Sequence, residues 1–293
     1  MTLVPLRLFR FIPPSLLRAI PLLSVRRLLL RSMNAALKRQ PMEFEIVTPF
    51  GFRFAGNTRD VIQRHVYVFG VWEPDVTAWM TSNVTPGSVV VDVGANVGYF
   101  TLLLAELVGP NGIVHSVEPL PSTVRHLREN IELNPNPGGV VVHDVACSES
   151  EGTTEVFRAD SIGNSSTSWG EHSEGLVSCR TLDLLLKQTE PGLISLIKID
   201  AEGDEMGILV GASRTLALMS SGAAVLVEVT PEMLLGRGFV ANDPLKLMDE
   251  AGFDAYAIDN DYTPARYADR RVRRPERLLV AASTDQEVLF IKR

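Results

Sequence analysis

The stretch VVVDVGANVGYFT, residues 89–101, decides how the rest of this sequence is interpreted. Three valines lead into Asp92, and a turn that contains Gly94 and Gly98 leads into an aromatic and apolar run. Unbroken apolar strands are typical of parallel sheets buried on both faces. A glycine turn between such a strand and a helix forms a backbone-lined hollow at the carboxyl end of the strand, where open α/β sheets bind their ligands. We therefore expect a ligand at this turn.

From Ser88 onward, strand patterns alternate with helical patterns, which predicts an α/β fold with a largely parallel sheet covered by helices on both faces. The expected strands are residues 89–93, 113–118, 140–145, 196–200, 224–229, 254–259 and 287–292, with 278–283 pairing near the last two. The expected helices are residues 99–108, 122–133, 182–188, 204–218 and 243–251.

Ahead of this region, FEIVT and FRFAG alternate in strand fashion around Pro49, Phe50 and Gly51, which predicts a hairpin. Helical patterns interrupted near Gly70 and Pro74 follow it. The sequence therefore predicts three parts. They are a basic apolar extension (1–40), a hairpin with a helical cap (41–87), and a cofactor-binding domain (88–293).

Composition excludes some classes of protein. The 293 residues carry a net charge of −7, which argues against nucleic-acid binding, since that function needs a basic footprint. The two cysteines, Cys147 and Cys179, have neither CxxC spacing nor a histidine cluster typical of zinc sites. We therefore expect a reducing, cytoplasmic location. The composition predicts no particular oligomeric state.

The charge is unevenly distributed along the chain. Residues 1–40 hold eight lysines and arginines and no acid, and removing these eight charges from −7 leaves −15 for residues 41–293. Arginines interleaved with leucines, as in RAIPLLSVRRLLLRSM, suit a helix at a membrane surface. They also suit a helix packed on the acidic body of the same chain, or a targeting peptide. These three interpretations stay open.

The order of residues in the turn favours one cofactor class. G-A-N-V-G departs from the G-x-G-x-x-G fingerprint of dinucleotide-binding folds. Asp92 would sit badly beside a pyrophosphate, which prefers helix N–H groups and positive charge. It suits a cationic ligand such as the sulfonium S-adenosyl-L-methionine (SAM). Glu118 ends the next strand, where a carboxylate can accept hydrogen bonds from both ribose hydroxyls.

A weaker expectation concerns the adenine: Asp144 can accept from its amino group while Val145 and Ala146 line the ring. The complete set of residues expected to bind the cofactor is Asp92, Gly94, Ala95, Asn96, Gly98, Tyr99, Glu118, Pro119, Asp144, Val145 and Ala146.

Four motifs together carry a family resemblance: DVGANVGYFT (92–101), SVEP (116–119), CRTLD (179–183) and KIDAEG (198–203). In this combination the chain resembles the FkbM-like family of SAM-dependent methyltransferases over roughly residues 65–292, including GVWEP at 70–74. The resemblance implies a class I methyltransferase fold, Rossmann-like, with about seven strands of which the last is antiparallel. It also implies mostly O-methylation of hydroxyl groups on small metabolites or sugars. Residues 1–40 lie outside it.

Methyl transfer to oxygen requires the acceptor to be aligned with the methyl group and to lose a proton. The candidate catalytic residues at the ends of the fourth and fifth strands are Asp200, Glu202 and Glu228. Asp200 is the expected base or positioning group, although Lys198 on the same side predicts a salt bridge. Glu202 is also consistent with a helix N-terminal acid, and Glu228 with a substrate-orienting acid or a metal ligand. We expect no metal.

Residues 160–175 are rich in serine and glycine and predict a loop that serves as a lid over the acceptor. The lid would present Asn164, Ser165, Ser166 and Trp169. His172 is the histidine expected to have access to a substrate, although a lone loop histidine is usually inert. Upstream of the core sheet, Trp72 and Glu73 are expected to close the other side of the acceptor site.

Two other functions compete with methyl transfer. One is a nucleotide (NAD)-dependent oxidoreductase, which Asp92 and the missing G-x-G-x-x-G disfavour. The other is a non-catalytic membrane-associated binding module, disfavoured because the acids Asp92, Glu118 and Asp200 are all present. The expected acceptor is a small molecule, a sugar or a lipid-linked molecule, with peripheral membrane contact through residues 1–40.

Overall fold

The computed structural model describes most of the chain and divides it into two compact units. The described residues are 12–135, 139–158, 165–166, 172–259, 261–268, 273–281 and 284–293. Of the described residues, unit 1 comprises 12–79 and 261–268, and unit 2 comprises 80–135, 139–158, 165–166, 172–259, 273–281 and 284–293.

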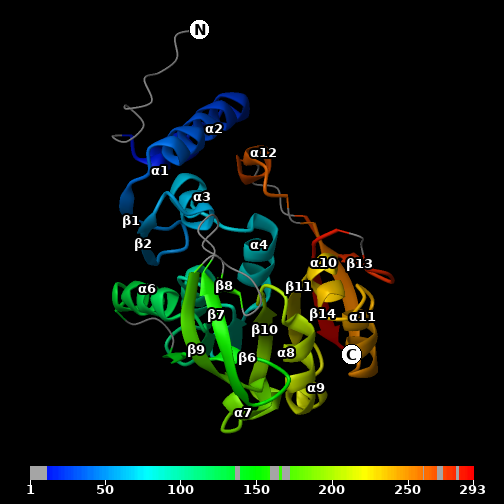
Figure 1. Ribbon diagram of the computed structural model, residues 1–293. Helices are drawn as coiled ribbons and strands as arrows, with labels where there is room; N and C mark the ends of the chain where they lie inside the picture. The colour runs from blue at the N-terminus through cyan, green and yellow to red at the C-terminus, as the bar shows by residue number, and fades with distance from the viewer. Residues whose placement is uncertain are drawn as a thin grey trace. The chain divides into compact units, whose positions relative to one another are not determined.

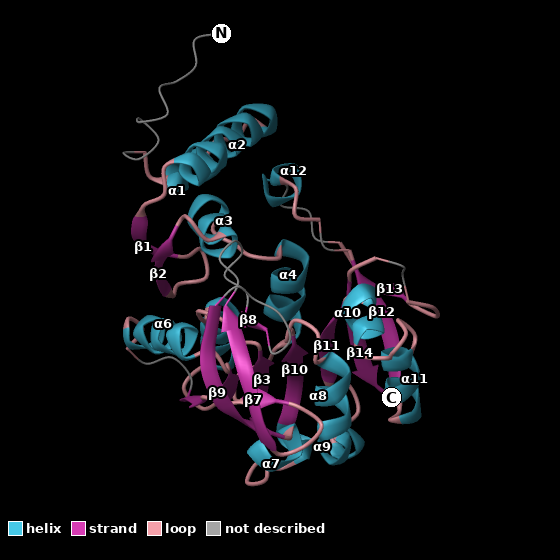
Figure 2. Ribbon diagram, in the orientation of Figure 1, coloured by secondary structure: helices cyan, strands magenta, loops and turns pink. Residues whose placement is uncertain are grey.

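Unit 2 is built on an eight-stranded sheet with the strand order β13-β12-β14-β11-β10-β3-β4-β5. Its strands β10, β11 and β14 are labelled in Figures 1 and 2. Its strands are β3 (Val89–Val93), β4 (Ile113–Val117), β5 (Gly139–His143), β10 (Ile194–Ile199), β11 (Ala224–Val229), β12 (Phe253–Ile258), β13 (Glu276–Arg277) and β14 (Gln286–Lys292). Strands β5, β4, β3, β10 and β11 pair in parallel, and β14 runs antiparallel between β11 and β12. This confirms the predicted sheet with its antiparallel last strand. The additional strand is the two-residue β13, which lies just ahead of the segment 278–283 predicted to pair there.

The helices of unit 2 are α5 (Tyr99–Val108), α6 (Pro121–Glu132), α7 (Leu182–Leu185), α8 (Glu205–Gly211), α9 (Ser213–Leu218), α10 (Pro231–Gly236) and α11 (Asp243–Glu250), with a 3-10 turn, η2 (Pro191–Leu193). Side chains alternate across a strand. Val91 and Val93 join the core cluster of Leu209 in α8, whereas the side chain between them, Asp92, bonds to Thr101 of α5. Helices α5 and α8 therefore cover opposite faces of the sheet.

A second, mixed sheet corrects the part of the predicted loop at 160–175 that is described, because residues 165–166 and 172–175 lie in its strands. It has the order β6-β9-β7-β8, from β6 (Ala146–Cys147), β7 (Gly152–Arg158), β8 (Ser165–Ser166) and β9 (His172–Arg180). His172 pairs with Arg158 at the start of β9 and is exposed, so it belongs to a strand. Pairing of β7 with β9 satisfies the backbone hydrogen bonds while the polar side chains stay in water. A serine-rich sequence can therefore form these strands without showing an apolar strand pattern. Asn164 and Trp169 lie outside the described residues.

Unit 1 contains α1 (Pro14–Arg18), α2 (Leu23–Arg39), the hairpin β1 (Glu43–Val47) with β2 (Arg53–Asn57), α3 (Val61–Phe69) and α12 (Pro264–Ala268). The hairpin confirms its prediction. Helix α4 (Pro74–Asn83) starts in unit 1 and ends in unit 2.

The GVWEP segment is held by aromatic contacts and a hydrogen bond within unit 1. Trp72 packs on the rings of Tyr262 and Tyr267 at centroid distances of 5.2 and 6.2 Å. The hydroxyl of Tyr262 donates to Glu73 over 3.2 Å. These contacts give Trp72 and Glu73 structural tasks in unit 1, and their closure of the acceptor site stays a prediction.

Candidate cofactor and acceptor site

The glycine turn between β3 and α5 adopts backbone conformations that require its sequence. Gly94, Asn96 and Gly98 have φ angles of 80°, 49° and 98°, a region that glycine and asparagine tolerate. A Cβ atom on Gly94 would lie 1.7 Å from the carbonyl oxygen of Asp200. The amide of Asp200 donates to Val93 over 3.0 Å. The turn therefore touches the end of β10, and Gly94 is needed for that contact.

Glu118 ties the glycine turn to the turn after β4. Its two carboxylate oxygens accept hydrogen bonds from the amides of Asn96 and Leu120, each over 3.0 Å, and its side chain is fully buried. A carboxylate has about four acceptor positions, so these bonds are compatible with further hydrogen bonds from ribose hydroxyls. The ribose role predicted for Glu118 stays a prediction, and a structural role is added to it.

Asp92 lies in a buried polar network behind the turn. The residue is fully buried, and its Oδ2 accepts a hydrogen bond from the hydroxyl of Thr101 over 2.7 Å. The same Thr101 hydroxyl also bonds to the hydroxyl of Ser116. The Oδ1 of Asp92 is buried and has no hydrogen-bond partner among the described residues. Burial raises the pKa of Asp92, and the positive charge of Lys198 opposes this effect. The carboxylate therefore helps to anchor α5 to the sheet.

The adenine residues predicted after β5 have mixed surroundings. Asp144 is exposed and forms an ion pair with Arg128 over 2.6 Å, so its carboxylate has a partner at the surface. Val145 is half-buried and Ala146 is buried at the start of β6. Of the remaining predicted cofactor residues, Ala95 and Tyr99 are buried and Pro119 is half-buried.

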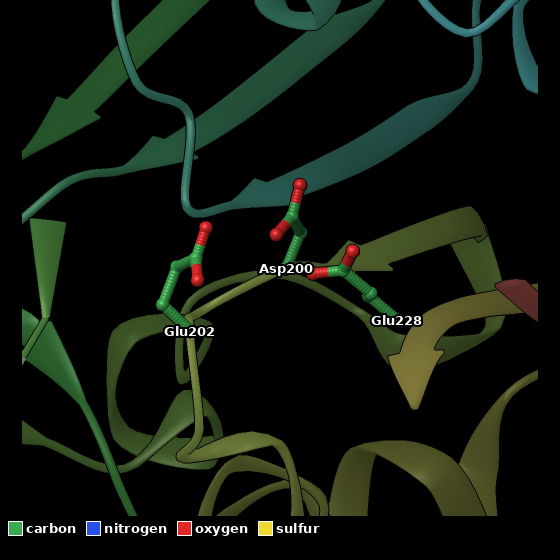
Figure 3. A group of neighbouring side chains, drawn as sticks. All are labelled: Asp200, Glu202 and Glu228. Carbon is green, nitrogen blue, oxygen red and sulfur yellow. The ribbon is translucent and has the colours of Figure 1, made fainter. Parts of the chain in front are cut away.

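Three predicted catalytic carboxylates converge at the ends of β10 and β11 (Figure 3). Asp200, Glu202 and Glu228 each place one carboxylate oxygen within 4.8 Å of the other two, and all three are partly exposed. Lys198 is 2% exposed, and its ammonium lies 2.7 Å from Asp200, which confirms the predicted salt bridge. The ammonium also sits 4.8 Å from the ring centre of Phe100. The structure thus brings the acids together beside the glycine turn.

The three acids differ in their affinity for protons. Burial alone favours the neutral form of Asp200, but the ammonium of Lys198 and hydrogen bonds outweigh it and lower the pKa of Asp200. Burial, and then the charges of Asp200 and Glu205, raise the pKa of Glu202 to about 8. Glu202 also has a φ of 53°, a strained conformation that is often found at functional sites. The site therefore pairs an ionised acid with one that is mostly protonated at neutral pH.

The same three carboxylates are the only group among the described residues with the spacing of a metal site. Oxygen ligands suit Mg²⁺ or Ca²⁺. However, Lys198 already compensates Asp200, and the proton affinity of Glu202 competes with a cation. The expectation that no metal is needed stays a prediction, which these two observations favour.

Glu205 is a site residue that the sequence interpretation missed. It is 2% exposed, and its Oε1 accepts from the amides of Ala201 and Gly203 over 3.2 and 2.9 Å. It therefore holds the loop that carries Glu202. The available signal was an acid in the first turn of the helix after KIDAEG, a position from which a carboxylate can bond preceding amides.

The charges and hydrogen-bonding groups around the glycine turn fit SAM. Residues 92–101 contain no lysine, arginine or histidine, and the acids bonded to this segment are Asp92 and Glu118. Carboxylates and backbone groups suit a ligand with a sulfonium, an ammonium and ribose hydroxyls, whereas a pyrophosphate would need positive charge. When bound, SAM supplies an electrophilic methyl group.

The fold and the site define a class I methyltransferase. The FkbM methyltransferase domain family matches residues 92–254. This match spans more than half of the chain, so the chain belongs to the FkbM family of SAM-dependent methyltransferases.

Individual relatives are more distant. The chain is 27% identical over 218 residues to the hexuronic acid methyltransferase AglP of Haloferax volcanii, covering 73% of this chain and 82% of AglP. It is 53% identical over 47 residues to a protein-L-isoaspartate O-methyltransferase of Aeropyrum pernix, covering 16% of this chain and only 18% of that protein. An O-methyltransferase from Bacillus cereus, solved with SAH, aligns at 15% identity and a TM-score of 0.42, covering 75% of this chain and 80% of that one.

Proposed function

We propose that this protein transfers the methyl group of SAM to a hydroxyl oxygen of a sugar. The observation that carries the proposal is the contact between the glycine turn and the acids, because Gly94 touches the backbone of Asp200. The hydroxyl acceptor is favoured by the acids of the site. A carboxylate acceptor would need no base, whereas Asp200, Glu202 and Glu228 can orient a hydroxyl and take up its proton. A hydroxyl acceptor, by contrast, is neutral and must lose a proton.

In the proposed mechanism, two acids have different tasks. Ionised Asp200, held by Lys198, accepts a hydrogen bond from the acceptor hydroxyl and orients it. Glu202 takes up the hydroxyl proton as methyl transfer proceeds, because a general base is most effective when its pKa lies near the working pH, and that of Glu202 is raised to about 8. Glu228 lies beside Asp200 and limits the orientation of the acceptor.

The sugar class is supported by AglP, a hexuronic acid methyltransferase that aligns with 73% of this chain. The test is incubation of the full chain with labelled SAM and two families of glycosides, neutral hexosides and hexuronides. We expect label in the sugar that survives mild alkali, because methyl ethers are stable and methyl esters are hydrolysed. Alkali-labile label would show a carboxylate acceptor and contradict the hydroxyl proposal. Absence of label from every sugar would contradict the sugar class.

A further inference from the structure

Residues 12–40 form a part of unit 1 whose charge differs from that of the remaining chain. The first 40 residues carry eight positive charges and no acid, and removing these from −7 leaves −15 for residues 41–293. The described portion folds into the helices α1 and α2. Six of the eight positive charges lie in this described portion, so positive charge is concentrated on one short helical segment.

One side of α2 is already occupied within unit 1. Leu30, Met33 and Leu37 are 2%, 0% and 1% exposed, and they recur at the spacing of one helix face. Helix α2 contacts both α3 and α12 (Figure 1). This face therefore holds α2 to the rest of unit 1. The basic helix thus packs on its own chain with one of its sides, as one of the three interpretations expected.

A different side of the segment exposes large aliphatic side chains. Val25 and Leu28, one helical turn apart on α2, are 39% and 51% exposed. Leu16 of α1 and Leu22, directly before α2, are 62% and 60% exposed. Four exposed aliphatic side chains within residues 16–28 indicate an interaction site.

Cations accompany these aliphatic side chains. Arg31, Lys38 and Arg39 are exposed, and none of the three forms an ion pair with a described residue. Together they complete what we name the α1–α2 surface: Leu16, Leu22, Val25, Leu28, Arg31, Lys38 and Arg39.

We propose that the α1–α2 surface docks on the interface of an anionic lipid bilayer. Aliphatic side chains enter the boundary between headgroups and acyl chains, while each lysine or arginine near an anionic surface contributes about 1 kcal/mol. A nucleic acid would use the cations but leave the leucines in water. Because the rest of the chain is acidic, an anionic surface repels it and selects this orientation. No helix among the described residues is long and apolar enough to cross a membrane.

The test is flotation of the full chain with phosphatidylcholine vesicles that contain or lack phosphatidylglycerol. We expect binding to the anionic vesicles that weakens as salt is added. The double variant Val25→Asp, Leu28→Asp should lower the partition coefficient at least about tenfold, because two aliphatic side chains lose their burial. Arg31→Gln with Lys38→Gln should weaken binding only to the anionic vesicles.

The matched control is Leu176→Asp, an equally drastic change at a residue of β9 that is 75% exposed; it should bind vesicles like the parent. Unfolding midpoints check that all variants fold. Equal binding by the parent and the Val25/Leu28 variant would overturn the proposal, as would no binding to either vesicle. If the Val25/Leu28 variant differed from the parent in sedimentation coefficient but bound vesicles equally, the α1–α2 surface would be an interface between copies of the chain instead. The readout is binding, so its failure is independent of the proposed methyl transfer.

Discussion

Replacing Glu202 by glutamine is expected to lower kcat/KM for methyl transfer about 10²–10⁴-fold, the usual contribution of a general base. In the parent, the rate should rise with pH through a midpoint near 8, because the pKa of Glu202 is raised to about 8 and only its ionised form accepts a proton. Glu202→Gln should abolish that rise. The measurement is kcat/KM against pH with labelled SAM and the sugar found above.

Asp200→Asn provides the second arm of this experiment. The rate should fall because the acceptor loses its orienting carboxylate, yet the rise with pH should persist. Its midpoint should move to lower pH, since the charge of Asp200 is one cause of the raised pKa of Glu202. Glu106→Gln, at an exposed position on α5, is the matched control and should behave like the parent. A parent-like pH profile in Glu202→Gln would place the base elsewhere.

Gly94→Ala is expected to destabilise the folded chain by about 3–5 kcal/mol, in the range of exceptional single substitutions. Two effects add: alanine is strained at a φ of 80°, and its Cβ would lie 1.7 Å from the carbonyl oxygen of Asp200. Relief requires the ends of β3 and β10 to separate, which strains the hydrogen bond from Asp200 to Val93. The measurement is the free energy of unfolding in urea.

Gly87→Ala separates these two effects. Gly87 has a φ of 82°, and a Cβ there would meet no atom within 4 Å. This variant should lose only about 1–2 kcal/mol, the cost of the left-handed conformation. If Gly94→Ala were no more destabilised than Gly87→Ala, the close approach of the turn to Asp200 would be contradicted.

Much of the sheet could be predicted because its strands are buried and apolar. VVVDV and AVLVEV matched β3 and β11 residue for residue, since short apolar runs bounded by turns have few alternatives. The helix predicted at 204–218 instead divides into α8 and α9 at Ala212. A Cβ on Gly211 would lie 2.3 Å from the carbonyl oxygen of Ser148. A contact between residues so far apart in the sequence produces no pattern in the hydrophobic periodicity from which the helix was predicted.

The sequence predicted which residues form the candidate site better than it predicted the hydrogen bonds and charge interactions between them. The acids of KIDAEG and Glu228 could be placed together because the carboxyl ends of parallel strands meet at one edge. The bonds of Glu118 to two amides depend on how two turns approach in space. The raised pKa of Glu202 likewise depends on three-dimensional surroundings, first on burial and then on the charges of Asp200 and Glu205. Neither property follows from spacing along the chain.

Calorimetric titration of the full chain with SAM tests the central claim most directly. We expect SAM to bind at one site and NADH to give no binding heat. Gly98→Trp should weaken SAM binding at least about tenfold, or 1.4 kcal/mol, because even a Cβ at Gly98 lies 2.7 Å from Leu127. Gly109→Trp, at the open far end of α5, should bind like the parent. No heat with SAM, or parent-like binding by folded Gly98→Trp, would contradict a SAM site at the glycine turn.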